Sequence, residues 1–136
     1  MTRPTLNLEK MLANLNPLVD AIPYCFILVS PATAPVALGS ALGTFREQEG
    51  VTAIVPESVA RELGDSGSPY SRITLQLMSP LNAVGLTSIV SSTLAEEGIS
   101  CNVVAAFHHD HLFVPWKRRF EAVDLLRNLQ KQYSTP

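Results

Sequence analysis

The sequence predicts an α+β fold in which helices cover one face of an antiparallel sheet. Hydrophobic residues make up 46% of the 136 residues and charged residues only 16%, so the chain can bury enough apolar surface to offset the entropy lost on folding. Apolar positions recur at helical spacing in some segments and alternate in others, which is typical of amphipathic helices and half-buried strands. At this length one cooperative unit is expected.

The N-terminal segment is predicted to form a short helix and then a strand. After Thr5, a residue type that caps helices well, four apolar side chains recur at helical spacing within 6–15. These are Leu8, Met11, Leu12 and Leu15. Pro17 and Pro23 are expected to bracket a turn, and the aromatic and β-branched run 24–29 predicts a buried strand.

The next segment predicts a loop, a hairpin and a second short helix. The residues up to Gly43 are rich in Ala, Pro, Gly and Ser, which is typical of a loop. A strand over 41–45 is expected to pair with a strand over 51–55 around the charged turn between them. Pro56 fits the first position of a helix that ends at the capping residue Gly64.

The second half of the chain predicts a similar set of elements, with a helix between its first two strands. The expected elements are a strand over 73–78, a helix that ends at Gly98, strands over 101–107 and 111–114, and an amphipathic helix after Pro115. This order is typical of ferredoxin-like βαββαβ units. Because one half lacks an opening strand and the other a final one, we expect the halves to share or exchange edge strands in one sheet. The polar stretch 65–69 is predicted to divide them into residues 1–68 and 69–136.

Four stretches of the sequence carry a family resemblance. They are SPLNAVGLT at 79–87, ISCNVVA at 99–105, FHHDHLFVP at 107–115 and TFREQEGVT at 44–52. The first two resemble the ACT-domain family of small regulatory modules that bind amino acids. The other two are similar to a tandem-ACT family related in design to arginine-sensing proteins. The likeness covers nearly the whole chain from about Tyr24 onward and implies two ACT-like halves, with no cofactor.

The resemblance implies a ligand site where the first strand of a module turns into its first helix. Here that turn is 79–87, where the free N–H groups of a helix start favour a carboxylate and Gly85 would let a ligand approach the backbone. Asn82 could contact a ligand or only cap the helix, and both readings stay open. The candidate ligand-binding residues are Ser79, Asn82, Ala83, Val84, Gly85, Leu86, Thr87 and Asn102.

The turn lacks one group that well-characterised amino-acid sensors contain. No acidic residue lies within 79–87 to hold an α-ammonium group. A facing module or a second subunit would have to supply that charge, for example through Glu47 or Glu49. The resemblance still implies a small molecule as the partner, with an amino acid as the first candidate.

The cluster His108-His109-Asp110-His111 contains side chain types that bind metals or act as general bases. Because neighbouring side chains on a strand point to opposite faces, only His109 and His111 converge readily, and one pair is too few for a closed zinc site. A solvated turn whose geometry Asp110 fixes is favoured, so no metal site is predicted. Cys101 and His108 lie too far apart along one strand for a catalytic pair, so no enzyme is expected.

Charge and hydropathy exclude several other classes of function. The formal net charge of −2 is too balanced to attract phosphate backbones or lipid headgroups, so neither a nucleic acid nor a membrane is an expected partner. The most apolar stretch, 21–28, is too short to span a bilayer, and the N-terminus lacks the apolar core of a secretory signal. A cytoplasmic location is therefore expected, with Cys25 and Cys101 as buried, reduced thiols.

Two functions are compatible with these observations. The first is a non-catalytic regulatory module that binds a small molecule, with an amino acid favoured. The alternative is a structural or interaction module that forms a homodimer through its sheet edge or a helix face without any ligand. A homo-oligomer, most simply a dimer, is expected for both.

Overall fold

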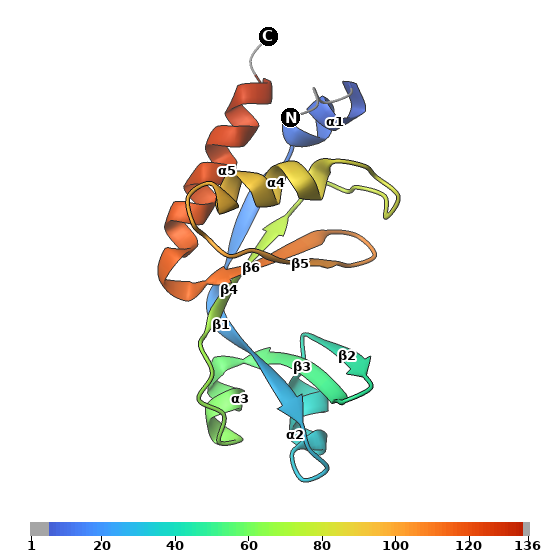
Figure 1. Cartoon of the computed structure of the whole chain (residues 1–136), viewed down its shortest axis with the longest axis vertical. Coiled ribbons are helices and arrows are strands. Elements are labelled where there is room, and N and C mark those ends of the chain that lie inside the picture. The colour runs from blue at the N-terminus through green and yellow to red at the C-terminus, as the bar shows by residue number, and fades with distance from the viewer. Residues whose placement is uncertain (1–5, 135–136) are drawn as a thin grey trace. The chain divides into compact units, whose positions relative to one another are not determined.

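The computed structural model describes residues 6–134, which group into two compact units (Figure 1). Unit 2 is Ala21–Tyr70, and unit 1 combines 6–20 with 71–134. This grouping differs from the division of the sequence into residues 1–68 and 69–136, because the first helix finds its apolar partners on the helices of the C-terminal half.

The elements repeat the order strand, helix, strand, strand, helix. The sequence predicted this order for the second half, whereas in the first half it predicted a loop in place of the first of these helices. In chain order the elements are α1 (Leu6–Leu12), β1 (Pro17–Val29), α2 (Ala34–Ser40), β2 (Gly43–Glu47), β3 (Gly50–Pro56), α3 (Glu57–Glu62), β4 (Tyr70–Leu75), α4 (Leu86–Ala95), β5 (Asn102–Ala105), β6 (Asp110–Pro115), the short 3-10 helix η1 (Trp116–Arg118) and α5 (Arg119–Ser134). The strands hydrogen-bond in the order β2-β3-β1-β4-β6-β5, in one sheet. The predicted α+β, ferredoxin-like fold with one continuous sheet is confirmed.

Unit 2 is a three-stranded antiparallel sheet with two short helices on one face. Register pairs Cys25 with Val55 and Ile27 with Ala53, and these side chains point toward the helices. There they form a small core with Ala37 of α2 and Ala60 of α3. Because side chains on a strand alternate, the intervening residues of β1 and β3 point to the opposite face.

Unit 1 has a larger core, built where α1, α4 and α5 pack on the sheet. Its most deeply buried side chains include Leu12, Leu15, Ile73, Leu94 and Leu126. The end of α1 is tied to α5 by Gln130, whose Nε2 donates to the carbonyl oxygen of Ala13 at 3.1 Å and whose Oε1 accepts from the backbone N–H of Asn16 at 2.9 Å. The N-terminal helix is therefore an integral part of this unit.

Two local predictions were wrong. Pro17 and Pro23 do not bracket a turn but lie within β1, where Pro17 is the first residue and Pro23 precedes the segment that pairs with β3. The segment predicted to be a loop contains α2, which begins after Ser30 and Thr33 exchange hydrogen bonds and has Pro35 in its first turn. No helix within residues 6–134 has both the length and the apolar character that a membrane crossing requires.

Candidate functional site

The candidate site lies where residues 76–85 connect β4 to α4. Helix α4 begins within the predicted turn 79–87, and its N-cap is Gly85, which has a left-handed backbone with φ of 97°. A Cβ atom at Gly85 would lie 2.8 Å from Cδ2 of Leu8 on α1. The space beside Gly85 that the sequence analysis assigned to a ligand is therefore filled by Leu8.

The start of α4 has no side-chain cap. Since the N-cap residue is a glycine, it has no side chain to accept hydrogen bonds from the first amides, and Asn82 is not the N-cap. The first intrahelical bond runs from the N–H of Ile89 to the carbonyl oxygen of Gly85, at 3.1 Å. The N–H groups of 86–88 precede that bond and carry the positive end of the helix dipole.

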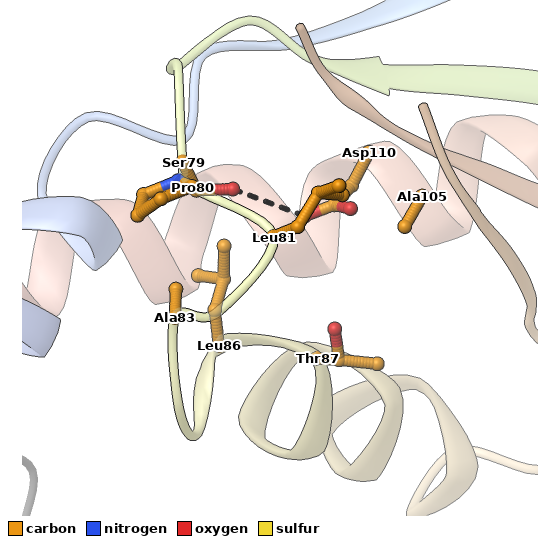
Figure 2. A pocket seen from close by; sticks show the side chains of 8 residues that line it. All are labelled: Ser79, Pro80, Leu81, Ala83, Leu86, Thr87, Ala105 and Asp110. Carbon is orange, nitrogen blue, oxygen red and sulfur yellow. Dashed lines mark hydrogen bonds between the residues drawn. The ribbon is translucent and has the colours of Figure 1, made fainter. Parts of the chain in front are cut away.

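A small pocket opens beside this helix start (Figure 2). Its cavity volume is about 60 Å³. The lining residues are Ser79, Pro80, Leu81, Ala83, Leu86, Thr87, Ala105 and Asp110. One wall is thus the loop and the first turn of α4, and the other wall is the end of β5 with the start of β6, which pair beside the hairpin turn. All of these residues belong to unit 1.

Asp110 supplies the acidic group that the loop 79–87 lacks. Its Oδ2 accepts a hydrogen bond from the Ser79 hydroxyl at 3.3 Å, drawn as the dashed line in Figure 2. The sequence predicts only a turn-fixing role for Asp110 and names Glu47 or Glu49 as the source of the charge. Glu47 instead accepts a hydrogen bond from the Thr52 hydroxyl at 2.8 Å.

The predicted hairpin contained a signal that Asp110 lies beside the end of the preceding strand. Ala105 is opposite Asp110 in the register of β5 and β6, and both line the pocket. A hairpin between the two predicted strands brings the residues on either side of its turn together at one end of the sheet. Which end lies beside the start of α4 is decided by the tertiary structure.

The structure places the eight predicted residues differently. Four of them line the pocket: Ser79, Ala83, Leu86 and Thr87. The other four do not: Asn82, Val84, Gly85 and Asn102. Val84 is exposed to solvent, and Asn102 lies opposite Phe113 at the far end of β5 from Ala105. Contact of any of these residues with a ligand stays a prediction.

The histidines flank Asp110 in the chain, and the rings of His109 and His111 form a T-shaped pair. His111 lies on β6 with its Nδ1 2.9 Å from the Thr74 hydroxyl, and the ring centroids of His109 and His111 are 6.5 Å apart. Burial lowers the pKa of His111, the charges of Arg72 and His109 lower it further, and Asp110 opposes them. Among the residues that the structure describes, no three His, Cys, Asp or Glu side chains are grouped to hold a metal ion.

The cysteines are both free thiols. Cys25 is fully buried, as predicted, whereas Cys101 is only partly buried. Burial raises the pKa of the Cys101 thiol to about 11. The thiol is therefore protonated near neutral pH, unlike the thiolate that nucleophilic catalysis needs.

Comparison with known proteins gives one family and several similar structures. Family models described as ACT domain match residues 4–70 and 68–128. The chain is 34% identical to a protein of unknown function from Vibrio cholerae, described as a possible transport protein, with a TM-score of 0.77 over 89% of this chain and 94% of the other.

Two further solved structures share the fold at lower identity. A protein from Agrobacterium tumefaciens is 23% identical, with a TM-score of 0.63 over 79% of this chain and 81% of the other. The ligand-free regulatory subunit of aspartate kinase from Thermus thermophilus is 8% identical, with a TM-score of 0.62 over 85% of this chain and 97% of the other. No curated protein matches the chain.

Proposed function

Because the chain belongs to the ACT-domain family, we propose that it is a non-catalytic regulatory module that binds a small amino acid in the pocket beside α4. The observation that carries the proposal is the pairing of opposite charges across that pocket. The uncapped start of α4 lies on one side and the Asp110 carboxylate on the other. A zwitterion matches this arrangement, with its carboxylate at the helix amides and its ammonium group at Asp110.

The size of the pocket supports a small head group as the bound part. Ligand pockets that enclose a whole drug-sized molecule typically measure roughly 300–1,000 Å³, against about 60 Å³ here. The pocket thus has room for the α-carbon with its two charged groups, while the ligand side chain extends over the rim. Leu81 lines the pocket and has a side chain exposed to solvent, which favours an apolar ligand side chain.

The regulatory part of the proposal rests on fold and family. One similar structure is the regulatory subunit of aspartate kinase, which supports a role in which ligand occupancy is transmitted to a partner protein. A cytoplasmic location stays a prediction from the sequence.

The proposal is tested with a thermal-shift screen against the twenty amino acids, followed by calorimetric titration of any hit. A ligand that binds only the folded state raises Tm in proportion to the logarithm of its concentration. Replacing Asp110 by asparagine, which keeps the shape but removes the charge, should weaken binding roughly tenfold to a hundredfold, the range for a hydrogen bond to a charged group.

The matched control is Asp124→Asn. Asp124 lies on α5, away from the pocket lining, with an exposed side chain 3.8 Å from Arg127. Its removal should leave the affinity unchanged. An amino acid that binds Asp110→Asn as tightly as it binds the wild type would contradict the assigned role of Asp110.

A ligand-free interaction module is the second candidate, and the free edge of β5 favours it. This strand is the last in the sheet, and Ala105 at its end lines the pocket. An unpaired edge can add a strand from another chain. If none of the twenty amino acids shifts Tm while the protein self-associates, this second function replaces the first.

A further inference from the structure

The sheet of unit 2 has an apolar face that its helices do not cover. Side chains on this face belong to β1 and β2 and are exposed: Ile22 by 44%, Phe26 by 36%, Leu28 by 68% and Phe45 by 71%. We propose that this open face is a homodimer interface, in which a second copy of the chain packs the same face against it. This surface differs from the edge of β5 and from the ligand pocket.

Strand register places these side chains together. Leu28 is opposite Thr52 on β3, and Thr52 is opposite Phe45 on β2, so the three form one row across the sheet. Phe26 begins the neighbouring row, opposite Ile54. The helices cover the alternate residues of β1, such as Cys25 and Ile27, so the row of Leu28 and Phe45 points away from them.

The open face carries little charge. No Asp, Glu, Lys, Arg or His occurs in 21–45, which includes the whole of β1 in unit 2 and the first half of β2. Glu47, at the end of β2, is hydrogen-bonded to the Thr52 hydroxyl. By strand alternation the Glu47 carboxylate lies on the same face as Phe45. In a twofold dimer each patch meets its own copy, so several like charges would repel one another, whereas this face carries one carboxylate on its three strands and that group is hydrogen-bonded to Thr52.

The exposed apolar area fits a dimer of ordinary size. A large side chain has an area of roughly 200 Å², so the exposed fractions of the four side chains correspond to about 400 Å² per copy. Two copies would bring together about 800 Å². A standard interface of about 1,600 Å² is roughly 57% non-polar, or about 900 Å². The four side chains therefore supply most of the apolar area that such an interface contains.

Gly43 gives the face a shape that can interlock with its own copy. It lies on β2 two residues before Phe45, so both residues belong to the same face. A Cβ atom added at Gly43 would meet nothing within 4 Å. Packed sheets interdigitate their side chains, so the gap at Gly43 can receive the protruding Phe45 ring of the second copy.

Sedimentation equilibrium across the micromolar range tests the proposal with two variants of the open face. Phe45→Glu introduces a charge at an exposed position, and Gly43→Gln fills the gap with a side chain whose Cβ meets nothing within 4 Å among residues 6–134. The wild type should be a dimer, and each variant should raise the dimer dissociation constant at least tenfold. Leu38→Glu is the matched control, because Leu38 is half-exposed on α2, on the helix side of the sheet.

Circular dichroism of each variant confirms that the fold is retained before its mass is compared. A wild type that stays monomeric throughout the concentration range overturns the proposal. So does a wild-type dimer that both open-face variants leave intact, since the contact must then lie elsewhere. If Leu38→Glu raises the dimer dissociation constant as much as the open-face variants do, the proposal is overturned as well, because the effect would not be specific to the open face.

Discussion

Replacing Gly85 with alanine should lower the free energy of unfolding of unit 1 by about 2–5 kcal/mol. A residue with a side chain in the left-handed region costs about 1–2 kcal/mol, and φ at Gly85 is 97°. The new Cβ would also lie 2.8 Å from Leu8 Cδ2, and overpacking of a core typically costs about 1–3 kcal/mol. These two penalties act on the same residue and together give the range.

Urea denaturation followed by circular dichroism measures this loss, and a second substitution separates its two parts. Truncating Leu8 to alanine removes the atom that the new Cβ would meet but leaves the backbone strain. The double variant should therefore be more stable than the sum of the single effects by about 1–3 kcal/mol. Gly64→Ala is the control for backbone strain alone, because Gly64 also has a left-handed backbone, with φ of 84°, and its added Cβ meets nothing within 4 Å among the described residues. A Gly85→Ala protein within about 0.5 kcal/mol of the wild type would refute the reasoning.

Two further predictions concern buried or partly buried polar groups in unit 1. Ser71 is fully buried and its hydroxyl has no hydrogen-bond partner among residues 6–134. Ser71→Ala should therefore raise the free energy of unfolding by about 1 kcal/mol in urea denaturation, and a loss would show that the hydroxyl is paired. The pKa of His111 is lowered in the fold. As the pH drops, His111 is therefore protonated in the unfolded chain before it is protonated in the folded one. The free energy of unfolding should fall as the pH drops from 6.5 toward the folded pKa. Denaturation of His111→Asn at a series of pH values should lack this slope, and an unchanged slope would contradict the assignment.

Local patterns predicted the elements whose side chains have a clear period. The amphipathic helix after Pro115 and the hairpin before it are present as α5 and β5–β6. Predictions from amino-acid composition were wrong where the apolar side chains have no clear period. The Ala- and Pro-rich segment containing α2 lacks a long apolar face, since only Ala37 of that helix is buried. Pro17 and Pro23 suggested a turn. Prolines are nevertheless tolerated at the first residue of a strand and at positions where the backbone nitrogen makes no hydrogen bond to a neighbouring strand.

The sequence by itself determined the α+β class, the order of elements in the second half and the position of a helix start within 79–87. The tertiary structure decided which groups surround that helix start. The pairing of β5 with β6 places Asp110 in the pocket lining, and Leu8 of α1 fills the space beside Gly85. Side-chain periodicity is a local property that a sequence displays directly. Contacts between residues far apart in the chain depend on how whole helices and strands pack, so they form only when the core forms.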